Sequence, residues 1–532
     1  MNGTEFVPVA LSLADICGED YLDAVCEARA FLSGEEPAAL QALAREPVDF
    51  FPQTFQERLL TLLPQVGNKV VDCASFASAG GATSTAFRSA TRREMAPLSA
   101  LGWYRCGEDG RLYLITKSEH YHASLGHRFP GYALLTRARQ LGIPNATHNN
   151  TRGHITRLLE EELVCAANGI PASDRAGLRS LVDSKSPDVL NRVLNLETGS
   201  LAVEAALKMM LARFYRMGHG QKAPQYAGRI PVILVIGDHD GGLDANYHGT
   251  TTLTQIMRGM WPELRKAMEE TGIFEVRAVR PNNMADLESA FLACDQGRHK
   301  IAGFLHEIVM MNYGGVLLSR EFLQRSYALC HAHDVPTLVD EIQTCAWGPE
   351  LFLFREYGLR PMFVTLGKGF PGGEYPASRI LFNASMDNEM PQFGALVTNG
   401  QEEIASLAYL ITMRWARVNA DVTGNVGEAY AARLRELAGQ FSSVIARVEG
   451  WRHMSTLFLH DLDTARSLIT HLTGMGIDIS AQTYKPDAPP ALLTKLPLIA
   501  SYEVVDFVVQ NLEGVLREME RELSGTAVHA AT

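Results

Sequence analysis

Disulfide and metal-binding signatures are scarce in this sequence. Its eight cysteines are scattered along 532 residues, with no CxxC pair and no spacing typical of metal ligands. Scattered cysteines in a chain of this length are typical of reduced thiols in a cytoplasmic protein. We therefore expect neither a disulfide framework nor a bound metal.

Long apolar runs and an excess of positive charge are also missing. No apolar run approaches the roughly 20 residues that span a bilayer, and the first residues have neither the basic segment nor the apolar core of a signal peptide. The formal net charge is −12, which disfavours the basic face that nucleic-acid binding needs. The sequence thus predicts a cytoplasmic protein that binds neither membranes nor nucleic acids.

What is present is the composition of a globular protein with a large core. Hydrophobic residues make up 46% and charged residues 20% of the chain. Residues 1–95 carry acidic and apolar residues at helical spacing, which predicts a helical N-terminal extension. We expect the N-terminal segment of the main fold at 96–165, a large domain at 166–420 and a smaller C-terminal α+β domain at 421–532.

The main part of the chain alternates helical patterns with apolar runs. A hairpin is expected over 102–116, and helices over 154–169 and from Ser200 to about residue 216. Strands are expected at 231–237, 274–279, 301–307, 336–342, 362–367 and 378–383. Continuous apolar strands between helices predict a largely parallel sheet that is covered on both faces.

A carboxylate and an amine follow two of these strands. Asp340 ends the run VPTLVD, and Lys368 follows the run MFVTLG. Because sites in parallel α/β sheets form at the carboxyl ends of strands, both side chains are expected in one crevice. An amine can form a Schiff base with an aldehyde cofactor, and a carboxylate can keep a pyridine nitrogen protonated. Either residue alone is more often a helix cap or a solvated lysine, but the pair predicts pyridoxal phosphate.

Two further motifs suit such a cofactor. In NLETGSLAVEAALK (195–208), Gly199 and Ser200 lie in a turn at the start of a helix, where backbone N–H groups can bind a phosphate. In NYHGTT (246–251), the ring of Tyr247 can stack on a planar cofactor. In isolation the first motif is more often a plain helix cap, and Tyr247 is as easily a core residue.

The order and spacing of these motifs resemble class III aminotransferases, the ω-aminotransferase-like branch of fold-type I pyridoxal-phosphate enzymes. The resemblance covers roughly residues 98–525, and its segments are DGRLYLI (109–115), LGHRFP (125–130), TGSLAVEAALK (198–208), YHG (247–249), DEIQT (340–344) and LGKGFPGG (366–373). It implies an α/β fold with a mostly parallel seven-stranded sheet in the large domain. It also implies an enzyme that acts on an amino acid or amine.

The resemblance implies a role for each matching residue. Lys368 forms the Schiff base and moves the proton, and Asp340 pairs with the pyridinium nitrogen. The other residues implied at the cofactor are Ile342 and Tyr247 on the two ring faces, Gln343 at the phenolic oxygen, Gly199 and Ser200 at the phosphate, and His248 near the ring. Thr398 is expected to reach the phosphate of a partner subunit, which implies a homodimer with a shared active site. Glu307 is expected near the substrate.

The sequence departs from the family mainly around the substrate. Glu197 stands beside the phosphate turn, and EIVMMNYGGV (307–316) carries an apparent insertion and lacks the family's usual proline. The stretch 488–501 offers Lys495 but not the arginine that binds a substrate carboxylate in many members.

These departures leave alternatives to a class III aminotransferase open. The first is a pyridoxal-phosphate-dependent lyase or carbon–carbon bond-forming enzyme of a biosynthetic pathway. Its reaction would be a β- or γ-elimination, a decarboxylation or an annulation, S-adenosylmethionine being one conceivable substrate. A catalytically silent scaffold is a further alternative, which the retention of both Asp340 and Lys368 disfavours.

Overall fold

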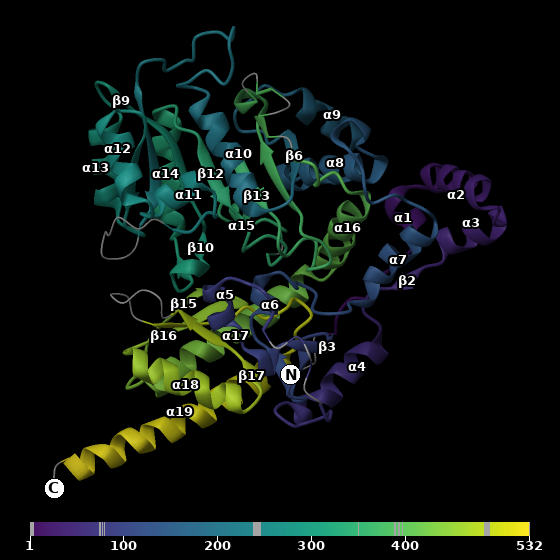
Figure 1. The fold of residues 1–532 in the computed structure, drawn as a ribbon, viewed down its shortest axis with the longest axis vertical. Helices are drawn as coiled ribbons and strands as arrows, with labels where there is room; N and C mark the ends of the chain where they lie inside the picture. The colour runs from purple at the N-terminus through teal and green to yellow at the C-terminus, as the bar shows by residue number, and fades with distance from the viewer. Residues whose placement is uncertain are drawn as a thin grey trace. The chain divides into compact units, whose positions relative to one another are not determined.

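The chain forms two compact units, shown in Figure 1. This computed structural model describes residues 5–73, 76, 78, 80–237, 246–348, 350–387, 390–391, 394–395, 397–482 and 490–530. By contacts, unit 1 is made of Met1–Pro8, Asp49–Gly131 and Asp421–Thr532, and unit 2 of Val9–Val48 and Tyr132–Ala420. The domain boundaries expected from the sequence stay a prediction.

Unit 2 is built on a sheet of seven described strands, in the order β6-β14-β13-β12-β9-β7-β8. The strands are β6 (Arg192–Leu196), β7 (Ile230–Ile236), β8 (Glu275–Val279), β9 (His299–His306), β12 (Thr337–Asp340), β13 (Phe363–Leu366) and β14 (Ser378–Phe382). Neighbours from β13 to β8 run parallel, and β14 is antiparallel to both of its neighbours. The mostly parallel seven-stranded sheet is therefore confirmed.

Six of the seven strands coincide with the predicted apolar runs, and β6 was missed. In β7 every residue is buried, as expected for a strand covered on both faces. In β6 the first three residues are only half-buried, because it lies at the edge of the sheet. An edge strand lacks the continuous apolar run on which the prediction depended.

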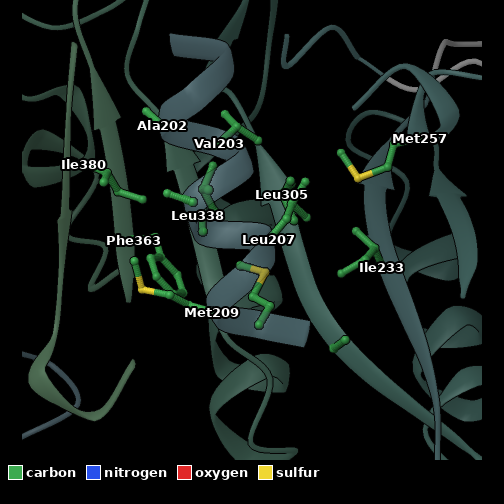
Figure 2. Close-up of a cluster of buried hydrophobic side chains, with 14 of the residues drawn as sticks. Ala202, Val203, Leu207, Met209, Ile233, Met257, Leu305, Leu338, Phe363 and Ile380 are labelled. Atoms are coloured by element: carbon green, nitrogen blue, oxygen red, sulfur yellow. The ribbon is translucent and has the colours of Figure 1, made fainter. Parts of the chain in front are cut away.

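The core of unit 2 lies between the sheet and α10 (Gly199–Leu211). Figure 2 shows Val203 and Leu207 of this helix packed among side chains of the strands, including Leu305 and Leu338. Burying each such side chain contributes roughly 1.5–3 kcal/mol. Helix α10 begins where the sequence predicted but ends at Leu211, before the expected residue 216.

The other helices of unit 2 cover the sheet or belong to the N-terminal part of the unit. They are α1 (Leu13–Cys17), α2 (Glu19–Ser33), α3 (Pro37–Arg45), α7 (Ala133–Gln140), α8 (His154–Asn168), α9 (Arg175–Asp183), α11 (Thr252–Met257), α12 (Pro262–Glu270), α13 (Met284–Cys294), α14 (Arg320–Ala332), α15 (Leu353–Glu356) and α16 (Glu403–Val418). The predicted α8 is confirmed, and it ends at Gly169, whose φ of +73° favours glycine.

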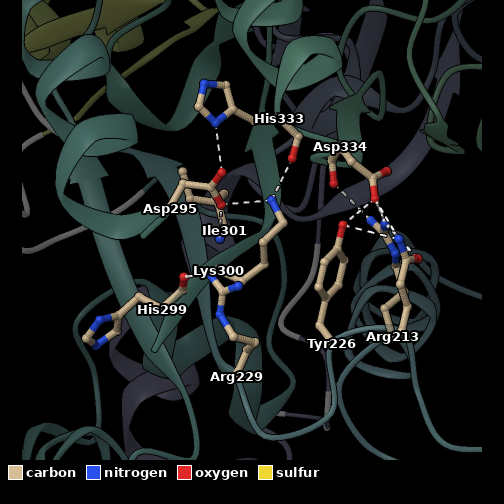
Figure 3. Close-up of polar contacts among 10 residues, drawn as sticks. Arg213, Tyr226, Arg229, Asp295, His299, Lys300, Ile301, His333 and Asp334 are labelled. Carbon is tan, nitrogen blue, oxygen red and sulfur yellow. Dashed lines mark hydrogen bonds and ion pairs between the residues drawn. The ribbon is translucent and has the colours of Figure 1, made fainter. Parts of the chain in front are cut away.

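Ion pairs and hydrogen bonds hold the amino end of β9 in place (Figure 3). The Lys300 ammonium donates to Asp295 Oδ1 at 2.8 Å and to the carbonyl of His333 at 2.6 Å. The next residue, Asp334, accepts from Arg213 Nη2 at 2.5 Å. These bonds join the start of β9 to the residues after α13 and α14, and the residues after α14 to the segment after α10.

Unit 1 contains two four-stranded sheets. One has the order β17-β5-β4-β3, made of β3 (Pro97–Leu101), β4 (Tyr104–Gly107), β5 (Leu112–Ile115) and β17 (Ile477–Asp478). The other has the order β15-β16-β19-β18, made of β15 (Ile445–Trp451), β16 (Met454–Leu459), β18 (Ser480–Gln482) and β19 (Ala491–Leu493). The predicted hairpin is confirmed, because β4 and β5 pair antiparallel on either side of Gly110, whose φ is +81°.

The helices of unit 1 are α4 (Gln53–Leu62), α5 (Thr85–Ala90), α6 (Ser118–Tyr121), α17 (Ala420–Gln440), α18 (Leu462–Gly474) and α19 (Tyr502–Ala530). Among the described residues, no helix combines the length and the apolar character that crossing a membrane requires.

Candidate active site

Asp340 lies at the end of β12, at the carboxyl edge of the parallel strands. Its Oδ1 accepts from Thr365 Oγ1 at 2.6 Å and from the backbone N–H of Ile342 at 3.2 Å. Its Oδ2 lies 3.0 Å from His248 Nδ1. Both Asp340 and His248 are buried. These contacts fix the orientation of the carboxyl group, which could pair with a cationic ring nitrogen.

The two ring nitrogens of His248 differ in their contacts within the described part of the chain. Its Nδ1 faces Asp340, while its buried Nε2 has no hydrogen-bond partner within the described residues. Asn246, two residues earlier, likewise has a buried Oδ1 without a partner among them. Unsatisfied buried polar atoms are costly, so their occurrence together is typical of a site that a ligand completes.

Lys368 follows β13 directly and lies between Gly367 and Gly369. Its φ is +35°, in the left-handed region that non-glycine residues rarely occupy and that is often found at functional sites. Burial lowers the pKa of the Lys368 amine, while the carboxylates of Glu307 and Asp340 oppose this shift. A lowered pKa increases the share of neutral amine, which is the nucleophilic form.

Glu307 follows the end of β9 and is completely buried. Its Oε2 accepts from Asn246 Nδ2 at 3.1 Å. Glu307, Asp340 and Lys368 lie at or just after the carboxyl ends of β9, β12 and β13. This is the edge of the sheet at which the sequence predicted a site.

The predicted phosphate turn forms the first turn of α10. Ser200 Oγ accepts from the backbone N–H of Thr250 at 3.1 Å, which ties the turn to the YHG segment. A Cβ on Gly199 would lie 2.9 Å from Ile342 Cδ1. A side chain at this position would push aside the side chain of Ile342, two residues after Asp340, so glycine allows the close approach of the two segments.

The remaining predicted residues differ in their surroundings. Tyr247 is half-buried, and the guanidinium of Arg258 lies 5.1 Å from the centre of its ring. Gln343 is buried in the loop after β12. Thr398 is exposed, in the loop that precedes α16. The structure thus gathers the other predicted residues around the carboxyl edge and leaves Thr398 on a surface of the chain.

Sequence reasoning missed several residues that hold this site. Thr365 bonds to Asp340, and the register of β12 and β13 places the two residues opposite each other. Asn246 bonds to Glu307, and Thr250 bonds to Ser200. The strands themselves were predicted, but their register was not, so a threonine one strand away gave no signal. The other two lie within the NYHGTT motif and were overlooked.

The segments in which the sequence departs from the family can also be located in the structure. The apparent insertion contains a small hairpin of β10 (Val309–Met310) and β11 (Val316–Leu317). Lys495 is completely buried in unit 1, where its Nζ lies 3.4 Å from the carbonyl of Tyr121. Among the described residues, no group of histidine, cysteine, aspartate and glutamate side chains could hold a metal ion.

Comparison with known protein sequences supports the resemblance. A family model described as Aminotransferase class-III matches residues 99–486. Ornithine aminotransferase car2 of Schizosaccharomyces pombe is 30% identical over 190 residues, which are 36% of this chain and 41% of the relative. 5-aminovalerate aminotransferase DavT of Pseudomonas aeruginosa is 28% identical over 288 residues, which are 52% of this chain and 62% of the relative. The chain thus spans about half the length of the curated relatives it matches.

Solved structures show the same fold. Ornithine aminotransferase from Toxoplasma gondii superposes with a TM-score of 0.62 at 18% identity, covering 80% of this chain and 90% of that one. A transaminase from the marine bacterium Virgibacillus gives a TM-score of 0.63 at 16% identity, covering 83% and 96%. At such identities the likeness concerns the fold alone.

Proposed function

Because the chain belongs to the class III aminotransferase family, we propose that it is a pyridoxal-phosphate-dependent aminotransferase acting on an amino acid or amine. The observation that carries this proposal is the buried Asp340–His248 pair near a lysine amine of lowered pKa. When bound, the cofactor supplies an aldehyde that accepts an amino group and a cationic ring that takes up electrons.

The residues at the carboxyl edge fit this cofactor. Lys368 would bind its aldehyde carbon and Asp340 its ring nitrogen. The backbone N–H groups at the start of α10, with Ser200, would bind its phosphate, since a helix N-terminus favours an anion. Tyr247 and Ile342 would pack on the two faces of the ring, with Gln343 at the phenolic oxygen. The close approach of Gly199 to Ile342 supports this proposal, because the start of α10 and the segment after β12 then lie side by side.

Each of these side chains has a task that follows from its surroundings. Asp340 is held in one orientation because Thr365, Ile342 and His248 contact its oxygens. Lys368 Nζ, when neutral, accepts a proton from the substrate carbon and returns it, since burial favours the uncharged amine. Glu307, held by Asn246, contributes negative charge beside this amine and is our candidate for a contact with the substrate.

The substrate class follows from the relatives. Besides the two described above, the matching proteins include 4-aminobutyrate aminotransferase GabT of Escherichia coli. These names support aminotransfer rather than the lyase or carbon–carbon bond-forming alternative. We therefore propose an amino acid or amine donor, and a biosynthetic role is consistent with it.

The assembly and location that we propose come from the same family assignment. Thr398 on its exposed loop would serve the phosphate site of a second copy, which makes the enzyme a homodimer with shared active sites. All eight cysteines are free, which supports a cytoplasmic location. No binding to nucleic acids or membranes is proposed for a chain of net charge −12.

A half-reaction tests the proposal. The purified protein, loaded with pyridoxal phosphate, is mixed with ornithine, 5-aminovalerate, 4-aminobutyrate, other amino acids, or S-adenosylmethionine, without a keto acid. Stoichiometric pyridoxamine phosphate and an oxo product, identified by mass spectrometry, are expected with one class of donor. Release of a leaving group or of carbon dioxide with the cofactor unchanged would instead establish the lyase alternative. Lys368→Ala serves as the inactive control.

A further inference from the structure

The strand that leads into the phosphate turn lies at the edge of the sheet. Strand β6 pairs with β14 on one side, and its last residues, Asn195 and Leu196, run directly into the turn before Gly199. An edge strand is less firmly fixed than an inner one, because a backbone ladder holds it on one side only. The position of the phosphate turn therefore depends on what covers the outer side of β6.

The side chain of Gln401 covers that side. Its Nε2 donates to the backbone carbonyl of Asn195 at 3.4 Å, and its Oε1 accepts from Asn195 Nδ2 at 3.1 Å. Both residues are 5% exposed. One buried amide thus bonds to the backbone and the side chain of the same residue. Glu160 Oε1 also accepts from Asn195 Nδ2, at 2.5 Å, but of these two partners only Gln401 reaches the backbone of the strand end.

The backbone at Gln401 is held just as firmly. Its carbonyl accepts from Thr147 Oγ1 at 2.5 Å and from Thr156 Oγ1 at 3.2 Å. The preceding residue, Gly400, has a φ of +114° and approaches β6 so closely that a Cβ there would lie 3.0 Å from the Asn195 carbonyl oxygen. We call the contact of Gly400 and Gln401 with Asn195 the β6 clamp.

The same loop carries Thr398. The carbonyl of Val397 accepts from Asn149 Nδ2 at 3.1 Å. The loop is therefore fixed on the N-terminal side of Thr398 as well as at Gln401. Between these fixed points Thr398 and Asn399 are exposed. The β6 clamp therefore joins two elements in one rigid piece, namely the strand end that supports the phosphate turn and the loop that presents Thr398.

We propose that Gln401 is a positioning residue that sets the affinity of the site for the phosphate of its cofactor. The inference rests on the proposed function, because Gly199, Ser200 and Thr398 are phosphate ligands only in that reading. Loss of the Gln401 amide uncouples the strand end from the loop, which keeps the bonds to its own carbonyls. The phosphate turn can then shift relative to Thr398, so phosphate binding weakens. The residues expected at the ring, Asp340 and Lys368, follow other strands and keep their places.

The fold should survive this change. Strand β6 keeps its ladder with β14, and the Arg379 guanidinium donates to the carbonyl of Leu196 at 3.3 Å. Gln401→Ala is therefore expected to fold, and Gln401→Met, which keeps the length of the side chain but removes the amide, provides a second variant. Thermal unfolding measures the stability of both.

The test compares two cofactors that differ only in the phosphate. Full-length protein freed of cofactor is titrated with pyridoxal 5′-phosphate and, separately, with pyridoxal, and absorbance reports binding. In Gln401→Ala the dissociation constant for pyridoxal phosphate should rise about ten-fold, the order expected for one buried hydrogen bond, while that for pyridoxal changes less than about two-fold. Gln401→Met should behave in the same way.

A matched control separates positioning from loss of stability. Lys300→Met disturbs the opposite end of the sheet and should lower the melting temperature while leaving the ratio of the two dissociation constants unchanged. Equal weakening of both cofactors in the Gln401 variants, or no change in either, would overturn the inference while the proposed function stands. Failure of the wild-type protein to bind pyridoxal phosphate would overturn the proposed function itself, so the two failures are distinguishable.

Discussion

The two ends of the seven-stranded sheet differ in how the polar side chains there are partnered. At the amino ends, the Lys300 ammonium bonds to Asp295 and to the carbonyl of His333, and the second oxygen of Asp295 lies 2.7 Å from His333 Nδ1 (Figure 3). At the carboxyl ends, His248 Nε2 and Asn246 Oδ1 are buried, and the described residues offer them no hydrogen-bond partner.

The difference separates groups that hold the fold from groups that are arranged for chemistry. A network of paired polar groups, such as that of Lys300, Asp295 and His333, rigidifies the elements that it joins. Polar atoms left unsatisfied cost stability and persist where a ligand completes them. The comparison predicts that variants at the carboxyl ends change chemistry more than stability, and that variants at the amino ends do the reverse.

Lys368→Ala is expected to have the largest effect on chemistry. Without the amine there is neither a covalent link to the cofactor nor a carrier for the proton, so turnover should fall below detection. Borohydride reduction followed by peptide mass mapping should find a pyridoxyl group on Lys368 in the wild type and on no residue of the variant. Turnover by the variant in the absence of added amine would contradict the assignment.

Asp340→Asn is expected to reduce turnover by about 10²–10³-fold, because a neutral partner no longer stabilises the charge of the ring nitrogen. The variant should still fold, since an amide can keep the bonds from Thr365 and Ile342. Turnover and thermal unfolding are measured on the same preparation. Unchanged turnover would show that Asp340 is structural.

His248→Gln is expected to have a smaller effect, a loss in turnover of about 10-fold, as is common for groups that orient a charged ligand. Glutamine can still donate to Asp340 but lacks the second ring nitrogen. The absorbance band of bound pyridoxal phosphate should therefore shift in the variant while its melting temperature stays at the wild-type value. An unchanged band together with unchanged turnover would mean that His248 only fills space.

Much of this contrast could be predicted from the sequence, and the part that could not depends on long-range geometry. Asp340 and Lys368 were found because each follows an apolar run, and the order of parallel strands brings such positions to one edge. Thr365 was missed because its bond to Asp340 depends on the register of two strands, which no local pattern fixes. Gln401 was missed because its partner, Asn195, is distant in sequence and lies in an edge strand without an apolar run.

Lys300→Met tests the other end of the sheet. It removes a charge that pairs with Asp295, whose side chain is 9% exposed, and breaking a buried pair costs about 3 kcal/mol. The free energy of unfolding, from urea titration, should fall by that order, while turnover per folded molecule stays at the wild-type level. A stable variant with altered turnover would break the comparison between the two ends.

Titratable groups at the two ends of the sheet should affect the stability of the protein in different pH ranges. Burial raises the pKa of Asp295, but hydrogen bonds from Lys300, His333 and the backbone outweigh it and lower the pKa below its ordinary value of 3.8. As pH falls, the carboxylate of Asp295 therefore takes up a proton at a higher pH in the unfolded chain than in the folded protein. The stability that Asp295 contributes is present above pH 3.8 and is lost as pH falls through the lowered pKa.

Lys368 affects the stability of the cofactor-free protein in the alkaline range. Burial lowers its pKa below the ordinary value of 10.5, so the unfolded chain binds more protons between the two values. In the cofactor-free protein, stability should therefore rise with pH over that alkaline window. Lys368→Met should flatten this rise and leave the acid limb unchanged, whereas Lys300→Met should weaken the acid limb alone. Urea unfolding across pH, with each variant compared with the wild type, measures both limbs, and a variant that altered both would show that the two ends are not independent.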